Sequence, residues 1–424
     1  MMRVSKRKNN TFESFSEKQL RVLSWWCPSS PDRNFDAIIC DGAVRSGKTA
    51  SMTLAFVIWA MSHFDRTNFA ICGKTVQSAE RNILIPFQTI EGLPYRLSYK
   101  SSKMVLTVRC GNCENYFYLF GGKDERSYTL IQGITLAGVL FDEVALMPQS
   151  FVDQAIARTL TYPNKKLWFN CNPDSPNHWF YLEWIRQPEK HNAVLLHFRM
   201  EDNPTMTPDA IRDAESMFSG VFYDRYIRGE WVVAEGRVYS QFSADRHVLR
   251  GSTSGMDGQF YVSIDYGTIN PCSMGLWCVQ QGRAVRLREW YHDSRREQRQ
   301  MTDEEYYEAL EELTRGYYIR RVIVDPSAAS FIECIRRHRR FSVWDADNDV
   351  LNGIRVTSSL LTAGMLVIHE SCTDTIREFG LYRWDEKSGN DKVLKENDHA
   401  MDDIRYFCYT VLAREFRWAD WKVQ

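Results

Sequence analysis

Apolar residues follow two different periods along this chain, and these periods predict alternating strands and helices. The run Phe35–Cys40 is short enough for a buried strand, and Ala50–Met61 carries apolar residues at helical spacing. The same criteria predict a strand at Asn68–Cys72 and a helix at Val76–Ile90. Further buried strands are predicted at 137–141, 166–170, 260–264 and 321–324. Strands that alternate with helices are typical of an α/β fold with a mainly parallel sheet.

One pair of apolar runs predicts a β-hairpin instead of a strand followed by a helix. Met104–Val108 and Tyr116–Phe120 flank a glycine–asparagine pair, which favours a tight turn. Cys110 and Cys113 fall in the same turn. A single CxxC pair with no second pair nearby is more typical of such a turn than of a zinc site.

The length of the chain predicts more than one domain. With 424 residues, two to three domains are expected. We assign residues 1–200 to a first domain, 201–254 to a helical linker or lid region, and 255–424 to a second domain. The stretch Gly251–Gly258 contains three glycines and is the expected hinge.

Composition and charge narrow the class of protein. The chain is 44% hydrophobic and 25% charged, as globular proteins are. No apolar run has membrane-spanning length, and the basic first ten residues have no apolar core behind them, so neither a membrane segment nor a signal peptide is expected. Eleven scattered cysteines favour a reducing compartment. Because the formal net charge is −1, a polyanion must be bound by local basic patches, of which Arg295–Arg299 and Arg336–Arg340 are examples.

The strongest chemical signal is a phosphate-binding loop. The eight residues from Gly42 to Thr49 fit G-x-x-x-x-G-K-[ST] at every fixed position. Backbone N–H groups of the loop, including those of Ser46 and Gly47, would surround a polyphosphate at a helix N-terminus. Lys48 would reach the outer phosphates, and Thr49 would bind Mg²⁺. Because the predicted strand and helix lie on the correct sides, we favour a nucleoside triphosphate site over a chance glycine-rich turn.

Acidic and amide residues at later strand ends complete the nucleotide chemistry. The strand at 137–141 ends in Asp142 and Glu143, which is common by itself but predicts hydrolysis when a phosphate loop precedes it. Asp142 would hold Mg²⁺, and Glu143 would orient and deprotonate the attacking water. The strand at 166–170 runs into a polar turn in which Asn172 is the candidate γ-phosphate sensor. A capped proline-rich turn is the alternative that the sequence leaves open.

A second set of acids lies in the C-terminal half. Asp265 and Asp325 each end an apolar strand, and one predicted helix carries His399, Asp402 and Asp403. Carboxylates suit Mg²⁺ or Mn²⁺, and two such ions about 4 Å apart activate water for phosphodiester cleavage. Each acid alone is more often a cap or a surface residue, whereas the complete set favours a nuclease.

With these motifs in order, the chain resembles the large terminase subunits of tailed bacteriophages, in particular those of Bacillus siphophages and prophages. The resemblance covers almost the whole chain. Its motifs are Gly42–Thr49, Val139–Glu143, Asn172-Pro173 with His178-Trp179, the linker from Ser219 to Trp231, Asp265-Tyr266-Gly267, Asp325, and Asp398–Asp402 with Arg405-Tyr406.

The resemblance implies a phosphate-loop ATPase domain of the ASCE type, with an extra strand between the two nucleotide motifs, joined to a ribonuclease-H-like nuclease domain. It implies ATP-driven movement of double-stranded DNA through a portal into a procapsid, and cutting of concatemeric DNA. ATP with Mg²⁺ would serve the first domain, and two Mg²⁺ or Mn²⁺ ions the second. The implied partners are DNA, a small terminase subunit and the portal protein, with a ring oligomer forming only on the portal. No membrane is involved, and the implied location is the host cytoplasm, not the mature virion.

Two departures from the family pattern affect the site residues. Similar proteins often carry an arginine before the lysine at the end of the second strand, where this chain has Gly73 and Lys74, so Arg45 becomes the candidate arginine finger. The position after the metal-binding aspartate is usually small, whereas here it is Asp403. Helical phase favours Asp402 only weakly, and the resemblance decides for Asp402 as the third ligand, with His399 beside the metals as a ligand or water-orienting group.

Two rival functions remain weaker than packaging. A helicase–nuclease or DNA-repair ATPase of the same broad fold would need strand-separating motifs beyond Asn172, which the sequence lacks. A structural protein that binds ATP without hydrolysing it is disfavoured by Glu143 and by the three acids of the second domain.

Overall fold

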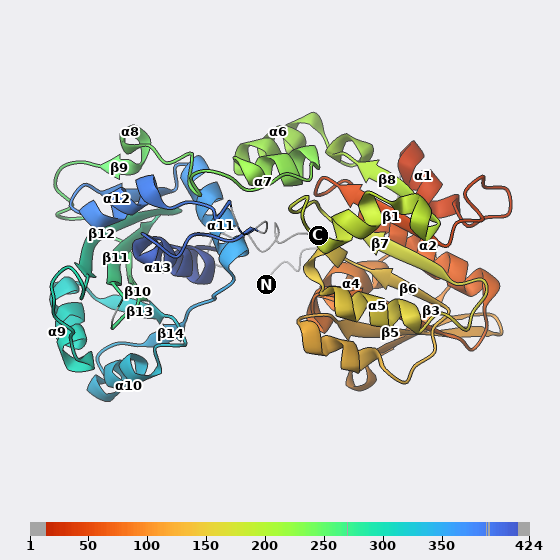
Figure 1. Ribbon diagram of the computed structural model, residues 1–424, viewed down its shortest axis with the longest axis horizontal. Coiled ribbons are helices and arrows are strands. Elements are labelled where there is room, and N and C mark those ends of the chain that lie inside the picture. The colour runs from red at the N-terminus through yellow and green to blue at the C-terminus, as the bar shows by residue number, and fades with distance from the viewer. Residues whose placement is uncertain (1–13, 269, 387, 389–390, 414–424) are drawn as a thin grey trace, which may run out of the picture. The chain divides into compact units, whose positions relative to one another are not determined.

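The structure is a computed structural model that describes residues 14–268, 270–386, 388 and 391–413, and these form two compact units (Figure 1). The N-terminal unit contains the described residues up to Arg212 together with Asp224–Val233. The C-terminal unit contains Asp213–Tyr223 and the described residues from Ala234 onward. Across the described part of the chain, the helices are too short or too polar for any of them to span a bilayer.

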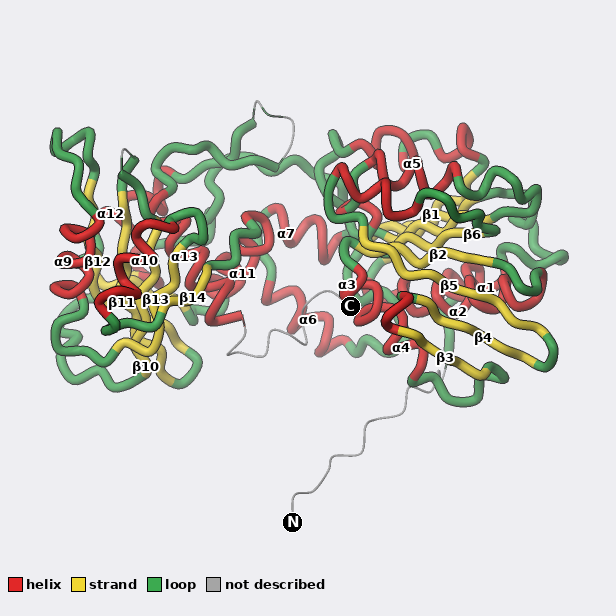
Figure 2. The backbone as a smooth tube through the Cα atoms, turned by 90° about the horizontal axis from the view of Figure 1, so that it is seen from below, coloured by secondary structure: helices red, strands yellow, loops and turns green. Residues whose placement is uncertain are grey.

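The N-terminal unit is built on an eight-stranded sheet with the order β3-β4-β5-β2-β6-β7-β1-β8. Neighbouring strands from β5 to β8 are parallel, and β3 and β4 add an antiparallel edge, where Figure 2 shows β3, β4 and β5 side by side. β7 lies between β1 and β6, as the ASCE fold requires. The strands are β1 Ala37–Gly42, β2 Asn68–Gly73, β3 Arg96–Lys100, β4 Val105–Cys110, β5 Cys113–Gly121, β6 Gly138–Phe141, β7 Lys166–Asn170 and β8 Ala193–Phe198.

Both faces of this sheet are buried, which explains the continuous apolar runs of its strands. Alternate residues of a strand point to opposite faces, so Ile38 of β1 joins one core and Ile39 the other. The first core includes helix α2 (Lys48–His63), with Trp59 against Trp168 of β7. The second core includes helix α5 (Gln149–Ala157). The other N-terminal helices are α1 Glu17–Ser24, α3 Val76–Ala79 and α4 Ile85–Gln88.

The predicted hairpin and its turn are confirmed. β4 pairs with β5 antiparallel, and Cys110 lies opposite Cys113 at the turn. Both cysteines are free thiols. The CxxC pair therefore belongs to a tight turn, as the sequence predicted.

The C-terminal unit is built on a seven-stranded sheet with the order β14-β13-β10-β11-β12-β15-β9. β10, β11 and β12 form an antiparallel meander, and β13 and β14 continue it in parallel beside β10, which is the ribonuclease-H arrangement. Helix α13 (His399–Phe407) packs on β10 and β11. The strands are β9 Val248–Leu249, β10 Gln259–Asp265, β11 Cys272–Gln280, β12 Arg283–His292, β13 Ile319–Val324, β14 Val343–Asp345 and β15 Leu366–His369. The remaining helices are α6 Pro208–Met217, α7 Val221–Tyr223, α8 Ala244–His247, α9 Asp303–Leu313, α10 Ala329–His338, α11 Val350–Thr362 and α12 Thr373–Leu381.

The glycine-rich stretch Gly251–Gly258, which the sequence suggested as a hinge, lies inside the C-terminal unit. β9 precedes this stretch and pairs with β15. Still earlier in the chain, Tyr239 is fully buried, and Phe242 stacks on Phe379 with 4.1 Å between ring centroids. The chain passes between the units near residues 213, 224 and 234, so the region 201–254 is shared between them.

Candidate nucleotide-binding and nuclease sites

The phosphate loop links the end of β1 to the start of α2, as its flanking patterns predicted. Gly42 closes β1 with φ of +121°, and a Cβ atom there would lie 2.0 Å from the carbonyl oxygen of Phe198. Only glycine fits this position, because the backbone of β8 passes too close for a side chain. Arg45, at the top of the loop, has φ of 56° and accepts a hydrogen bond at its carbonyl from Asn203.

Lys48 is buried at the base of this loop. Its ammonium group donates to the carbonyl oxygens of Ala43 at 2.6 Å and Gly42 at 3.1 Å, and to Ser46 Oγ at 3.2 Å. It also donates to Asn172 Oδ1 at 3.2 Å, so the candidate sensor lies next to the lysine that is expected to bind phosphate. Burial lowers the pKa of Lys48 to about 8. A polyphosphate beside the ammonium would stabilise its charged form.

Asp142 lies at the end of β6 in a buried cluster of amides. Its carboxylate accepts hydrogen bonds from Asn170 Nδ2 at 2.7 Å and from Asn82 Nδ2 at 3.1 Å. The hydroxyl of Thr49 lies 3.4 Å from the same carboxylate, and Asn170 Nδ2 also donates to that hydroxyl at 2.8 Å. Burial raises the pKa of Asp142, while the three hydrogen bonds act in the opposite direction. The hydroxyl and the carboxylate expected to hold Mg²⁺ are thus brought together.

The oxygen chemistry of this cluster fits a hydrated Mg²⁺ ion. Asn170 Oδ1 is buried and has no hydrogen-bond partner among the described residues. A buried acceptor without a donor is uncommon in proteins, and the water shell that Mg²⁺ retains offers donors of the right kind. Thr49, Asp142 and Asn170 therefore provide a hard-oxygen environment of the type that this ion prefers.

Glu143 lines the same cavity as the loop. It follows Asp142 with φ of 55° and starts the short turn Val144–Leu146. The cavity has a volume of about 690 Å³, which is within the range of small-molecule sites. Its walls include Ser14, Gln19, Arg45, Arg81, the apolar residues Ile83, Ile85, Pro86, Phe87 and Ile90, and Asn203 to Met206. The N-terminal segment therefore contributes to this site through Ser14 and Gln19.

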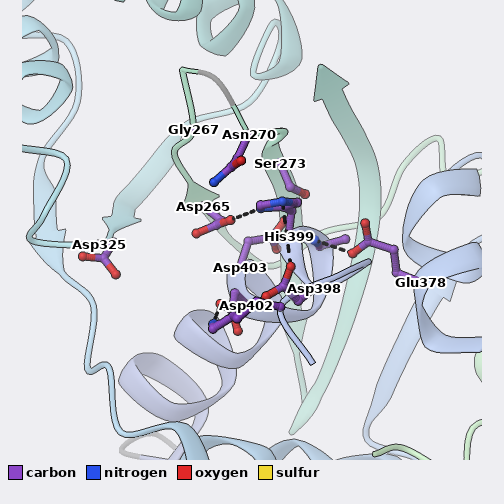
Figure 3. A network of polar contacts seen from close by, with 12 residues as sticks. Asp265, Gly267, Asn270, Ser273, Asp325, Glu378, Asp398, His399, Asp402 and Asp403 are labelled. Atoms are coloured by element: carbon purple, nitrogen blue, oxygen red, sulfur yellow. Dashed lines mark hydrogen bonds and ion pairs between the residues drawn. The ribbon is translucent and has the colours of Figure 1, made fainter. Parts of the chain in front are cut away.

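Asp265, His399, Asp402 and Asp403 lie together where α13 packs on β10, and Asp325 lies to one side of them at the end of β13 (Figure 3). Asp265 ends β10 and forms a 2.8 Å hydrogen bond with Nδ1 of His399, at the start of α13. Burial raises the pKa of Asp265 to about 6, and the negative charge of Asp402 acts in the same direction. His399 and Asp402 are thus both close to Asp265, as predicted.

Asp325 follows β13 and is held by three donors. Tyr406 donates its hydroxyl to Asp325 Oδ2 at 2.9 Å, Asn348 donates to the same oxygen at 2.8 Å, and the backbone of Ser327 donates to Oδ1 at 2.7 Å. Burial acts to raise the pKa of Asp325, but these hydrogen bonds outweigh it and lower the pKa. Tyr406 therefore links α13 to the second strand-end acid.

Tyr406 also lies within electrostatic range of all three candidate ligands. Burial raises the pKa of its phenol, and the charges of Asp265, Asp402 and Asp325 raise it further. Among the described residues, these three carboxylates do not bring one oxygen each within 4.8 Å of one another.

Asp402 and Asp403 have different surroundings. Asp403 is fully buried and forms an ion pair with Arg286 of β12, with Nη2 to Oδ2 at 2.9 Å. It also accepts hydrogen bonds from Ser263 Oγ at 2.9 Å and from Ser273. Asp402 instead contacts Arg405, at 3.1 Å, and Lys395, at 3.3 Å. Both oxygens of Asp403 are therefore occupied by donors from the sheet.

Comparison with known proteins gives consistent matches. The family model for the N-terminal part of T4-like terminase large subunits matches residues 39–245. The large terminase of a thermophilic bacteriophage is 45% identical, with 94% of this chain and all of that one covered, and superimposes with a TM-score of 0.91. This chain belongs to the phage large terminase family. The same thermophilic phage protein has also been solved with ADP, at 44% identity and a TM-score of 0.89.

A more distant relative is the large terminase subunit of Escherichia phage T5. It is 24% identical over 291 residues, which is 64% of this chain and 65% of the T5 protein. The matched part of this terminase therefore spans just under two thirds of that relative.

The segment Asp224–Val233 belongs to the N-terminal unit and contacts the phosphate loop of this terminase. The backbone N–H of Val44 donates to Tyr226 at 2.8 Å, and Trp231 Nε1 donates to Asp41 at 2.9 Å. Gly229 has φ of +76°, and a Cβ there would lie 2.9 Å from the backbone nitrogen of Ala43. The segment Asp224–Val233, from which the chain continues into the C-terminal unit, is thus bonded directly to the nucleotide loop.

Several residues of these sites were not singled out from the sequence. Asn170 ends β7, so its position at the carboxyl edge beside β6 could have identified it. No sequence pattern marks Glu378. It is fully buried and accepts hydrogen bonds from the backbone of Ala400 and from Tyr291 at 2.7 Å each. The bond to Ala400 positions the first turn of α13. Burial raises the pKa of Glu378 to about 7. Asn82 likewise became apparent only from the fold.

Proposed function

We propose that this terminase hydrolyses ATP in its N-terminal unit to move double-stranded DNA into a procapsid, and cuts concatemeric DNA with its C-terminal unit. The observation that carries the proposal is the presence of two separate sets of polar residues, one at the carboxyl edge of each sheet. The first surrounds Lys48 and Asp142, and the second surrounds Asp265 and His399. The nucleotide complexes of the thermophilic phage relative support the first assignment.

In the N-terminal unit, Lys48 would hold the β- and γ-phosphates while loop N–H groups bind the remaining oxygens. Thr49 and Asp142 would hold Mg²⁺, which neutralises phosphate charge when bound. Glu143 would take a proton from the attacking water. Asn172, which accepts a hydrogen bond from Lys48, would sense whether the γ-phosphate is present.

Arg45 is the proposed arginine finger, because it lies in the loop that lines the cavity. We expect Arg45→Lys to lower kcat about 100-fold or more while changing ATP affinity little, since lysine keeps the charge but loses the planar fork. Steady-state ATPase assays and nucleotide titration measure the two effects. Arg81→Lys is the matched control, because Arg81 lines the same cavity and donates to Asn82 at 3.1 Å. If kcat falls in Arg81→Lys but not in Arg45→Lys, Arg81 is the arginine finger.

In the C-terminal unit, Asp265, Asp325 and Asp402 would hold two Mg²⁺ or Mn²⁺ ions, which supply an activated water and stabilise the leaving oxygen. His399, bonded to Asp265, would bind one ion or orient the water. Tyr406 would fix Asp325, and Glu378 would fix the helix that carries His399 and Asp402.

The C-terminal unit should fold and cleave DNA by itself if it starts at the boundary that its packing defines. We expect residues 234–424 to linearise plasmid with Mn²⁺ and without ATP, and to be inactive with EDTA. The matched control is residues 255–424, which lacks β9 and the buried Tyr239 and Phe242. We expect the shorter fragment to melt at a lower temperature. A folded, inactive longer fragment would contradict an autonomous nuclease.

The proposed partners are double-stranded DNA, a small terminase subunit and the portal protein, with ring assembly on the portal in the host cytoplasm. The decisive assay measures ATP hydrolysis by the full chain with and without double-stranded DNA and procapsids. Packaging predicts stimulation by both and protection of DNA from added nuclease. If the protein instead unwinds duplex DNA and ignores procapsids, the helicase–nuclease alternative is correct.

A further inference from the structure

Three metal-binding side chains meet on the C-terminal unit outside the carboxylate site. Glu304, Cys334 and His338 each offer one ligand atom, and these atoms all lie within 4.8 Å of one another. No other group of three or more such side chains reaches this spacing in the part of the chain that the structure describes. None of the three belongs to the nucleotide or nuclease chemistry above.

Helical geometry brings these residues together. Cys334 and His338 are four residues apart on α10, so they share one face, and Glu304 comes from the first turn of α9. His338 Nε2 lies 2.7 Å from Glu304 Oε2, and its ring stacks on Tyr307 with centroids 3.7 Å apart. Cys334 is buried, whereas the side chains of Glu304 and His338 are exposed. The cluster therefore has its sulfur at the base and is open to solvent on one side.

We propose that Glu304, Cys334 and His338 bind a Zn²⁺ ion. Zinc accepts sulfur, imidazole and carboxylate ligands together, and three protein ligands leave a fourth position for water. A thiolate does not suit Mg²⁺ or Ca²⁺, so this chemistry differs from that of the acids at Asp265. The simpler alternative is a surface Glu–His pair over a buried thiol, which would contribute little to stability.

An ion at this position would join two helices that support the nuclease site. Tyr266, next to Asp265, bonds to Asp303 of α9 and stacks on Phe331 of α10 with centroids 4.9 Å apart. Tyr306 of α9 also donates to the carbonyl of Gly267 at 2.8 Å. By fixing α9 against α10, zinc would hold the turn after Asp265 in place. Its role would be structural, separate from the two catalytic ions.

The test uses the full chain, freed of metal with a chelator and then titrated with Co²⁺ and Zn²⁺. We expect one Co²⁺ per chain to give a near-ultraviolet thiolate-to-metal band, which Zn²⁺ abolishes by displacement. Cys334→Ser should remove the band, and His338→Gln should weaken Zn²⁺ binding about 100-fold or more. In hundredfold excess over Kd, Zn²⁺ should raise the melting temperature of the C-terminal unit by about 5 to 10 °C.

Two control variants separate this site from others. Cys110→Ser removes a partly exposed thiol outside this cluster and should leave the band unchanged. Asp265→Asn combined with Asp402→Asn removes nuclease ligands and should leave both the band and the Zn²⁺-dependent melting shift in place. The proposal is overturned if the wild-type protein gives no band, or if Cys334→Ser keeps the band. Equal melting shifts in wild type and His338→Gln would also overturn it.

Discussion

Replacing Glu143 by glutamine should reduce ATP turnover about 100- to 10,000-fold while preserving ATP binding. The amide has the same shape as the carboxylate but cannot accept the proton of the attacking water. Position 143 has φ of 55°, and glutamine at this position adds no branching that would increase the backbone strain. Phosphate release measures turnover, and a fluorescent ATP analogue measures affinity.

Lys48→Ala provides the contrasting result, because it should abolish hydrolysis by preventing ATP binding. The ammonium of Lys48 is buried at the base of the loop expected to bind phosphate, with the Ala43 carbonyl oxygen 2.6 Å away. The two variants thus separate binding from chemistry. Wild-type turnover in Glu143→Gln would show that another group is the base.

The N-terminal unit could be predicted well because its signals are local. Strands buried on both faces read as continuous apolar runs, so β1 and β7 were found within two residues of their true bounds. The loop between β1 and α2 depends on glycines such as Gly42, where a Cβ atom would lie 2.0 Å from the carbonyl oxygen of Phe198. Asn82 was not found, because a polar residue in a helical stretch is uninformative until its helix is placed against Asp142.

In the C-terminal unit, local sequence patterns predicted only part of the candidate site. The strand-end positions of Asp265 and Asp325 could be read from the sequence, but their partners could not. Asp403 and Arg286 are 117 residues apart, and only the packing of α13 on the sheet brings them together. The expected hinge at Gly251–Gly258 lies inside the C-terminal unit for the same reason. Glycines favour a turn inside a domain as much as between domains, and the local sequence does not distinguish the two.

The adjacent acids of α13 should give opposite results when each is changed to asparagine. We expect Asp402→Asn to abolish DNA cleavage. It also removes the counter-charge of the buried Arg405, so it should destabilise the C-terminal unit, but by less than Asp403→Asn, because Asp402 is slightly exposed and Asp403 is fully buried. Asp403→Asn should destabilise the C-terminal unit by about 3 to 5 kcal/mol, because it leaves Arg286 buried without a counter-charge. Plasmid cleavage and urea unfolding of each purified variant measure the two effects.

The ATPase activity should survive in both variants. Measuring it tests whether the effect of each change is confined to the C-terminal unit. His399→Ala should also lower cleavage severely, since His399 contacts Asp265 directly. Under conditions in which it stays folded, the Asp403→Asn variant should retain cleavage. In the wild-type protein the carboxylate of Asp403 is bonded to Arg286, Ser263 and Ser273, so it has no oxygen left for a metal. If Asp403→Asn is stable but inactive and Asp402→Asn cuts normally, Asp403 is the metal ligand and α13 must rotate when the ions bind.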